Sequence, residues 1–344
     1  MKKKTKVLIV DDSVLFREIL ARYLAEDPRI EVVAKAADPY EARDMIIKYR
    51  PDVMTCDIEM PKMNGIEFVK RLIPQYPMPV IIISSVSGVV FDAMRAGAVD
   101  FVPKPSDRSP DGIHNFAREL VSKIIAAAGA KVRGGRLHPA NAFAAVGKTA
   151  ERQFDHKKVI AIGSSAGGIE ALNEILKSLP PTIPGILVVQ HIPPVFSRMF
   201  AERMDRETAL NVVEAKTGEL ILPGKVLIAP GDKHMRVRKI GSRYVTEVFG
   251  DERVNGHCPS VDVLFSSVAK VYGANAVGVI LTGMGRDGAE GLLEMKNQGA
   301  TTIGQDEKTS VVYGMPKVAF EIGAVEKQYP IYEIADAIMA AVKI

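Results

Sequence analysis

Short apolar runs, most of them followed by helical segments, recur along most of this 344-residue chain. Such alternation predicts parallel β-sheets whose strands are joined by right-handed helical crossovers. The first series of expected strands is 6–11, 31–37, 53–57, 79–84 and 99–103. A second series is expected at 158–163, 186–190, 226–229, 276–282 and 301–304, with a hairpin near 234–249 and helices near 169–179, 195–207, 260–272, 288–298 and 332–343. The pattern predicts an α/β protein.

A basic stretch rich in glycine and alanine separates the two series of strands. Between residues 129 and 158 there are seven basic and two acidic residues, a net +5, which leaves −1 for the rest of a chain of net charge +4. A chain of this length favours two domains over one small core. We expect an N-terminal domain at 1–125, a linker at 126–156 and a larger catalytic domain at 157–344. The folded parts are nearly neutral, whereas a DNA-binding domain normally has a basic face.

Composition favours a cytoplasmic location. The two cysteines, Cys56 and Cys258, fall in different expected domains, which argues against a disulfide framework. No apolar run approaches the ~18 to 20 residues that a membrane span needs. The basic start of the chain leads straight into an expected strand, so no signal peptide is predicted. We therefore expect a cytoplasmic protein that does not insert into the membrane.

Acidic, hydroxyl and basic side chains follow the strands of the first series. Asp57 ends one buried run, Asp11 and Asp12 follow another, and Ser84 and Lys104 stand at the ends of two more. Ligand sites of open α/β sheets form at this carboxyl edge. Three crowded carboxylates favour a bound cation, and oxygen ligands suit Mg²⁺. With the hydroxyl and the lysine added, the site can stabilise a phosphoryl group on Asp57.

Residues 5 to 122 resemble the receiver domain of response regulators, a doubly wound, flavodoxin-like fold with a five-stranded parallel sheet. The resemblance implies that Asp57 accepts a phosphoryl group from a histidine kinase. The implied Mg²⁺ ligands are Asp11, Asp12, Asp57 and the backbone carbonyl of Glu59. Ser84 and Lys104 would contact the phosphoryl oxygens. Phe101 stands where the family has an aromatic switch residue.

The second series opens with a strand that runs into a glycine-rich turn. Residues 163–167 read Gly-Ser-Ser-Ala-Gly, which fits the G-x-S-x-G pattern with Ser165 at its centre. Such a turn leaves the serine hydroxyl exposed, and the N-terminus of the helix that follows favours a developing negative charge. A glycine-rich turn before a helix also suits phosphate binding. The motif alone leaves both possibilities open.

A base and an acid stand at the ends of two other strands of the second series. A serine hydroxyl needs a base to react at neutral pH. His191 follows the strand expected at 186–190, and Asp287 follows the strand expected at 276–282. Both should meet Ser165 at one sheet edge, where Asp287 can orient the imidazole and stabilise its cation. The three residues together predict a catalytic triad.

Other candidate groups near these strands are weaker. His257 and Cys258 are adjacent and would point to opposite faces of an extended chain, so they form no nucleophile–base pair. His234 and His257 lack the helical spacing of a zinc pair. Residues 260–262, Ser-Val-Asp, read as a helix start. The backbone N–H groups of Ala166 and Met284 are candidates for an oxyanion hole.

The second series also resembles the catalytic domain of the chemotaxis protein-glutamate methylesterases, the CheB family. Five motifs in the family's order carry the resemblance, at 163–168, 190–194, 228–235, 259–265 and 282–288. Three positions depart from the common pattern: Ser164, Ala166 and Cys258 stand where alanine, threonine and arginine are frequent. The first departure raises the question of which serine reacts, and the G-x-S-x-G register selects Ser165.

The resemblance implies a phosphorylation-activated serine hydrolase for chemotactic adaptation. It would demethylate glutamyl methyl esters of methyl-accepting chemotaxis receptors with release of methanol, and it would deamidate receptor glutamines. A chemotaxis histidine kinase would be the phosphodonor, Mg²⁺ would bind only at the receiver, and nucleic acid would not be a partner. A nucleotide- or phosphate-binding output domain and a DNA-binding output domain remain the alternatives.

Overall fold

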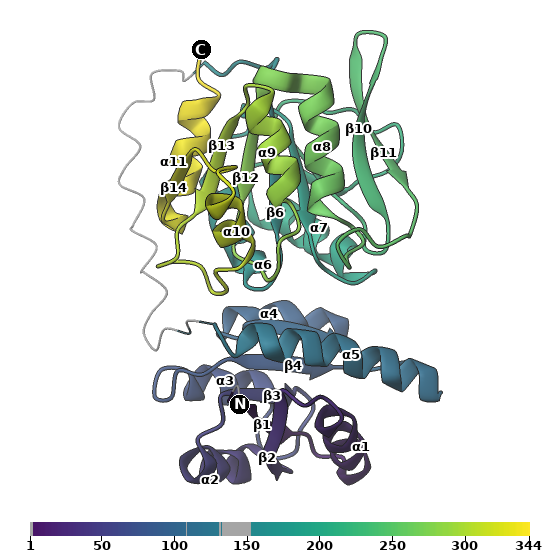
Figure 1. Cartoon of the computed structure of the whole chain (residues 1–344), viewed down its shortest axis with the longest axis vertical. Coiled ribbons are helices and arrows are strands. Elements are labelled where there is room, and N and C mark those ends of the chain that lie inside the picture. Colours follow the sequence, from purple (N-terminus) through teal and green to yellow (C-terminus); the bar gives the residue numbers. More distant parts are fainter. Residues whose placement is uncertain (1–2, 108, 131, 133–152) are drawn as a thin grey trace. The chain divides into compact units, whose positions relative to one another are not determined.

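The computed structural model describes residues 3–107, 109–130, 132 and 153–344. Internal contacts divide the chain into two units, Met1–Ala145 and Val146–Ile344. Most of the linker expected at 126–156 lies outside the described residues. Each unit is an α/β structure with a parallel sheet (Figure 1).

The first unit contains a five-stranded sheet in the order β2-β1-β3-β4-β5, and all its strand pairs are parallel. This order confirms the predicted doubly wound fold. Its elements are β1 Thr5–Val10, α1 Val14–Ala25, β2 Ile30–Ala36, α2 Pro39–Tyr49, β3 Val53–Asp57, α3 Gly65–Leu72, β4 Val80–Ser84, a 3₁₀ turn Ser87–Val89, α4 Val90–Arg95, β5 Asp100–Pro103 and α5 Pro110–Ala127.

Local sequence explains where the helices of this unit begin. Side chains of four residues that precede helices accept hydrogen bonds from backbone N–H groups of the first turn: Ser13, Asp38, Asn64 and Ser109. Such caps satisfy donors that have no partner within the helix. Strands β3 and β4 are buried along their whole length, which fits the apolar run 80–83 in β4 and the mainly apolar residues of β3.

The second unit contains a seven-stranded parallel sheet in the order β14-β13-β12-β6-β7-β9-β8. Its elements are β6 Val159–Ser164, α6 Gly168–Ser178, β7 Ile186–Gln190, α7 Phe196–Glu207, β8 Asn211–Glu214, β9 Lys225–Ile228, β10 His234–Ile240, β11 Arg243–Phe249, α8 Val261–Tyr272, a 3₁₀ turn Gly273–Asn275, β12 Ala276–Ile280, α9 Ala289–Asn297, β13 Thr301–Gln305, α10 Met315–Glu321, β14 Lys327–Tyr329 and α11 Ile331–Ala341. Strands β10 and β11 form the predicted antiparallel hairpin.

The centre of this sheet determines where a ligand can bind. Strand β6 pairs with β7 on one side and with β12 on the other. The chain proceeds from β6 to β7 in one direction, and β12 is followed by β13 and β14 in the opposite direction. Ligands of open α/β sheets bind outside the carboxyl ends of the strands at such a reversal. The loops that follow β6, β7 and β12 therefore meet at the expected binding edge.

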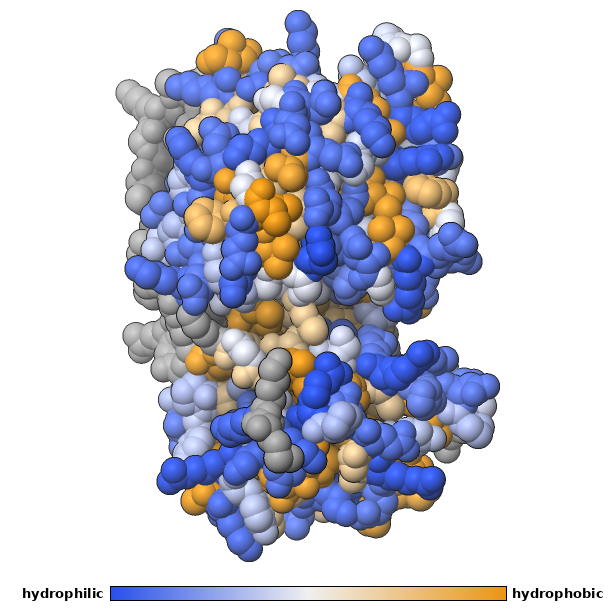
Figure 2. All heavy atoms as spheres, in the orientation of Figure 1, coloured by the Kyte–Doolittle hydropathy of each residue, from blue (hydrophilic) through white to orange (hydrophobic). Residues whose placement is uncertain are grey.

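Charged and polar side chains cover most of the visible face of each unit, and apolar residues there lie in small separate patches (Figure 2). Within the described part of the chain, no helix combines the length and the apolar character needed to cross a bilayer.

Candidate functional sites

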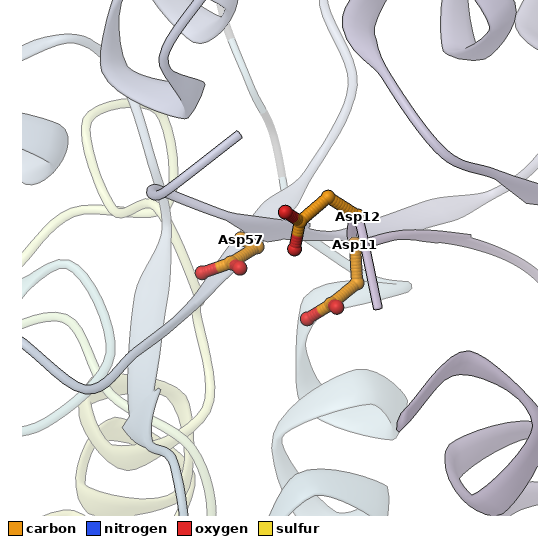
Figure 3. A group of neighbouring side chains, drawn as sticks. All are labelled: Asp11, Asp12 and Asp57. Atoms are coloured by element: carbon orange, nitrogen blue, oxygen red, sulfur yellow. The ribbon is translucent and has the colours of Figure 1, made fainter. Parts of the chain in front are cut away.

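Three carboxylates meet at the carboxyl edge of the first sheet. Asp57 ends β3, and Asp11 and Asp12 directly follow β1 (Figure 3). One carboxylate oxygen from each residue lies within 4.8 Å of the others. Asp11 and Asp57 are 2% and 1% exposed, whereas Asp12 is exposed to solvent. Three oxygen donors at this spacing, one of them open to water, fit a divalent cation that keeps part of its hydration shell.

Lys104 partly balances the buried charge of this cluster. Its Nζ lies 2.6 Å from Asp57 Oδ2 and 2.9 Å from Asp11 Oδ2. Burial raises the pKa of the Asp57 carboxyl, and the Asp11 charge adds to this effect, although Lys104 opposes it. Burial alone would lower the pKa of the Lys104 ammonium, but its contacts with Asp57 and Asp11 outweigh burial and raise that pKa. Because one lysine faces two buried carboxylates, the cluster retains a net negative charge that a bound cation can neutralise.

The other predicted receiver residues lie on β4, on β5 and directly after β3. Ser84 ends β4, and its Oγ accepts a hydrogen bond of 3.0 Å from the Val86 N–H. The Glu59 N–H points to Asp57 Oδ1 at 3.4 Å. Phe101 is buried in β5, with Lys123 Nζ 5.3 Å from the centre of its ring. The side chain of Lys123 was not identified from the sequence.

The end of β6 and the turn that follows it present two serines in different surroundings. Ser164 is completely buried, and its Oγ donates a 2.6 Å hydrogen bond to Gln190 Oε1. Ser165 is half-buried, and its N–H donates to the Thr282 carbonyl at 3.0 Å. Gly167 has φ +76, and a Cβ there would lie 2.6 Å from Val311. The turn therefore needs glycine at this position, and only the second serine reaches toward solvent.

Contacts among the three loops bring Ser165 and His191 to neighbouring positions. The His191 N–H donates to the Ser164 carbonyl at 3.0 Å. Gln190 Nε2 donates to the Ser165 carbonyl at 2.9 Å and lies 3.1 Å from the His191 carbonyl. A Cβ at Gly283, in the loop after β12, would lie 2.8 Å from Ser165 Cβ. The amide of Gln190 thus connects the two loops, a role that sequence reasoning missed.

His191 is bound to Asp287 through one particular ring nitrogen. Its Nε2 lies 2.8 Å from Asp287 Oδ2, whereas its buried Nδ1 has no hydrogen-bond partner among the described residues. Because the carboxylate accepts the Nε2 proton, Nδ1 carries a lone pair and can act as a base. In chymotrypsin-like triads the two nitrogens have the opposite roles.

Asp287 is held by several donors besides His191. It accepts from Ser260 Oγ at 2.7 Å, from the N–H groups of Val261 and Asp262 at 2.7 and 3.2 Å, and from Asn255 Nδ2 at 3.3 Å. The side chain is therefore fixed at the N-terminus of α8, where the helix favours a negative charge. Burial alone would raise the pKa of the Asp287 carboxyl, but the contacts with His191, Ser260 and Val261 hold it well below its usual range. This side chain remains an anion at neutral pH.

Segment 255–262 thus supplies most of the donors that hold Asp287. This contribution was not predicted from the sequence. The Ser-Val-Asp residues of the segment do start a helix, as expected, but their donors point to Asp287. His234 Nδ1 in turn accepts from the Ser260 N–H at 3.2 Å. The ring of His257 stacks on that of His191, with centroids 3.8 Å apart and planes 7° apart. An Asn-Gly pair before His257 was the available signal, since this pair favours tight turns.

Both units match known protein families. A family described as "Response regulator receiver domain" matches residues 7–111, and one described as "CheB methylesterase" matches residues 160–338. A protein-glutamate methylesterase/protein-glutamine glutaminase of Syntrophomonas wolfei is 54% identical over 336 residues, which cover 98% of this chain and 97% of the relative. One of Syntrophotalea carbinolica is 48% identical over 94% of this chain and 93% of the relative. The crystal structure of the Thermotoga maritima CheB methylesterase catalytic domain is 38% identical, covers 53% of this chain and 97% of that domain, and has a TM-score of 0.52. The chain belongs to the CheB methylesterase family and carries a response regulator receiver domain before its methylesterase domain.

Proposed function

We propose that this protein is a phosphorylation-activated protein-glutamate methylesterase that acts on methyl-accepting chemotaxis receptors. It demethylates receptor glutamyl esters with release of methanol for chemotactic adaptation, and it deamidates receptor glutamines. The hydrogen-bonded His191–Asp287 pair beside the half-buried Ser165, in a chain of this family, is the observation that carries the proposal. The family gives no support to a nucleotide-binding or DNA-binding output domain.

In the proposed mechanism, Ser165 Oγ attacks the γ-carbonyl of the ester while His191 Nδ1 takes the hydroxyl proton. Asp287 keeps the other proton on Nε2 and stabilises the imidazolium. His191 then gives its proton to the departing methoxide, and methanol leaves an acyl-enzyme. A water molecule activated by His191 hydrolyses this intermediate and releases the glutamate side chain.

We assign the oxyanion hole to the backbone N–H groups of Ala166 and Met284. Ala166 directly follows Ser165 after β6, and Met284 follows Gly283, where a Cβ would lie 2.8 Å from Ser165 Cβ. Neither N–H has an acceptor within the described part of the chain, whereas the Gly283 N–H donates to the Val312 carbonyl. Free donors aimed at a developing oxyanion are a main source of stabilisation in acyl transfer.

The proposed partners and organisation follow from the two domains. A chemotaxis histidine kinase phosphorylates Asp57 in the receiver domain at 1–125, which the linker at 126–156 joins to the catalytic domain at 157–344. The protein works in the cytoplasm, where the signalling parts of its receptors lie. Methanol release from a methylated receptor, measured with and without acetyl phosphate, tests the activity and its control together.

Mg²⁺ is the cation proposed for the Asp11–Asp12–Asp57 cluster, with the Glu59 backbone carbonyl as a further ligand. Bound there, it supplies positive charge that neutralises the carboxylates and the incoming phosphoryl oxygens. In the phosphorylated receiver, Ser84 and Lys104 contact the phosphoryl oxygens. The buried Phe101 acts as the aromatic switch residue.

Mg²⁺ is expected to stabilise the receiver domain against unfolding. Binding to the native state alone gives about 1.4 kcal/mol of stability when free Mg²⁺ is tenfold above its Kd.

The stability of the receiver domain should also depend on pH through Asp57. The raised pKa of Asp57 means that the native state binds the proton of this carboxyl more tightly than the unfolded chain does. Receiver stability without Mg²⁺ should therefore fall as the pH rises above the unfolded value of about 3.9, until the native carboxyl has ionised as well. Calorimetric melting over a Mg²⁺ and pH series measures both effects.

The variant Asp57→Asn provides the control for this prediction. It should melt no lower than the wild type in Mg²⁺-free buffer at pH 7 and should lose most of the Mg²⁺-dependent gain. An equal gain in both proteins would place the cation elsewhere.

Asp57→Asn is also expected to abolish activation by acetyl phosphate while basal hydrolysis persists. A phosphoryl group typically shifts a two-state equilibrium by about 1–3 kcal/mol, so wild-type activation should be about 5- to 150-fold. Initial rates of methanol release measure the ratio for each protein. Asp44→Asn, which changes an exposed carboxylate on α2, is the matched control and should be activated normally. Activation of Asp57→Asn would mean that another residue carries the phosphoryl group.

A further inference from the structure

A tight turn carries His257 to the active site. The Val254 N–H donates to the His257 carbonyl and the His257 N–H donates to the Val254 carbonyl, both at 3.0 Å. The two residues between them, Asn255 and Gly256, have φ values of +55 and +82. Positive φ at both central positions defines the turn type that Asn-Gly favours most strongly. The local sequence therefore fixes the direction in which His257 leaves the turn.

Two side chains of this turn contact the hydrogen-bonded pair of His191 and Asp287. Asn255 Nδ2 donates to Asp262 Oδ2 at 2.6 Å and lies 3.3 Å from Asp287 Oδ1. The His257 ring lies flat on the His191 ring, 3.8 Å between centroids and 7° from parallel. The turn thus contacts the acid through Asn255 and the base through His257.

The two contacts on His191 restrict different motions. The hydrogen bond to Asp287 restrains one edge of the His191 ring, at Nε2. A ring held only at one edge can still tilt about that bond, which would change the direction from which Nδ1 takes the Ser165 proton in the proposed mechanism. A flat aromatic neighbour opposes this tilt, and its face also suits the positive charge that His191 acquires during proton transfer. Small errors in such alignment are costly to rate.

We infer that His257 is a positioning residue for the reaction: its ring, presented by the Asn255–Gly256 turn, keeps the His191 imidazole in the plane in which Nδ1 faces Ser165. This inference rests on the proposed serine chemistry. It requires an aromatic ring at position 257 and no proton transfer by His257 itself.

Two substitutions separate the ring from other properties of His257. His257→Leu replaces the ring by an aliphatic side chain and should lower kcat for methyl ester hydrolysis about tenfold, the size expected for one aromatic pair, with KM changed less than about twofold. His257→Phe keeps a flat ring and should stay within about threefold of the wild-type kcat. Equal losses in both variants, or no loss in His257→Leu, would overturn the inference.

The rate of Ser165 labelling by a fluorophosphonate gives the same comparison without a receptor. We expect the order wild type, His257→Phe, then His257→Leu. If this order holds while the wild type releases no methanol from receptors, the proposed substrate is wrong but the role of His257 stands. If labelling proceeds equally in all three proteins, the role of His257 is wrong whatever the substrate. NMR adds a direct readout: the carbon-bound ring protons of His191 should move downfield in His257→Leu, because the ring current of the stacked neighbour is lost.

A backbone variant tests the turn if His257→Leu does not fold. A Cβ at Gly256 would meet no atom within 4 Å, so Gly256→Ala adds only the strain of an alanine at φ +82. It should lower kcat about three- to tenfold at nearly constant KM. Gly218→Ala, at φ +88 with equally open surroundings, is the matched control and should lose similar stability without loss of kcat. Equal kcat in the two glycine variants would contradict the role of the turn.

Discussion

Replacing Ser165 by alanine is expected to lower kcat for receptor demethylation by at least about 10⁴-fold. The variant retains the fold but has no nucleophile to form the acyl-enzyme, and removal of the nucleophile in a serine protease costs about 10⁶-fold. Ser165 is half-buried, and the hydrogen bonds of its backbone survive the substitution. Methanol release by the purified variant, together with its thermal unfolding curve, measures both parts of the prediction.

Ser164→Ala is the matched control for this experiment. Ser164 is fully buried and donates its hydroxyl to Gln190 Oε1. Its loss should cost about 1 kcal/mol of stability, as for one buried hydrogen bond, and should leave kcat within about tenfold of the wild type. A fluorophosphonate should still label Ser164→Ala and should not label Ser165→Ala. The reverse pattern would identify Ser164 as the nucleophile.

Asp287→Asn is expected to lower kcat by about 10⁴-fold, the loss known for the equivalent change in trypsin. The carboxylate accepts hydrogen bonds from both side-chain and backbone donors, whereas an amide has only one accepting oxygen. An amide NH₂ directed at His191 would select the ring tautomer with its proton on Nδ1, which cannot take the proton of Ser165. The pH dependence of kcat/KM in the variant tests this change of tautomer.

Asp262→Asn provides the matched comparison. Asp262 is also buried, and it binds the Gly291 N–H and Asn255 Nδ2 instead of His191. Burial and the neighbouring Asp287 charge raise the pKa of its carboxyl. Its neutralisation should therefore change kcat by less than about tenfold. Equal losses in the two variants would indicate that Asp287 acts through the structure of the segment and not through His191.

The pKa shift of Asp287 also predicts how stability depends on acid. Its native pKa lies below the unfolded value of about 3.9, so its contribution is complete above that value and is lost as the pH falls through the native pKa. Asp287→Asn should accordingly flatten the dependence of unfolding free energy on pH below about 4, a change that acid titration of the catalytic domain can detect.

Much of the architecture could be read from short-range patterns. Runs such as 80–83 and 186–189 are apolar throughout because their strands are buried on both faces, and helices are marked by caps such as Ser13 and Asn64. The edge strands Asn211–Glu214 and Lys327–Tyr329 and the helix Met315–Glu321 were missed. They are short and partly exposed, so they have too few apolar residues to produce a periodic signal.

The sequence alone determined that Asp57, Ser165, His191 and Asp287 would stand at strand ends, because a parallel sheet brings every carboxyl end to one edge. Only the tertiary structure decided that His191 binds Asp287 through Nε2, that the N-terminus of α8 holds the carboxylate, and that His257 stacks on the imidazole. These contacts join residues 25 to 96 positions apart. Rotamers and ring orientations at such separations depend on how whole elements pack, and no local pattern of residues encodes that packing.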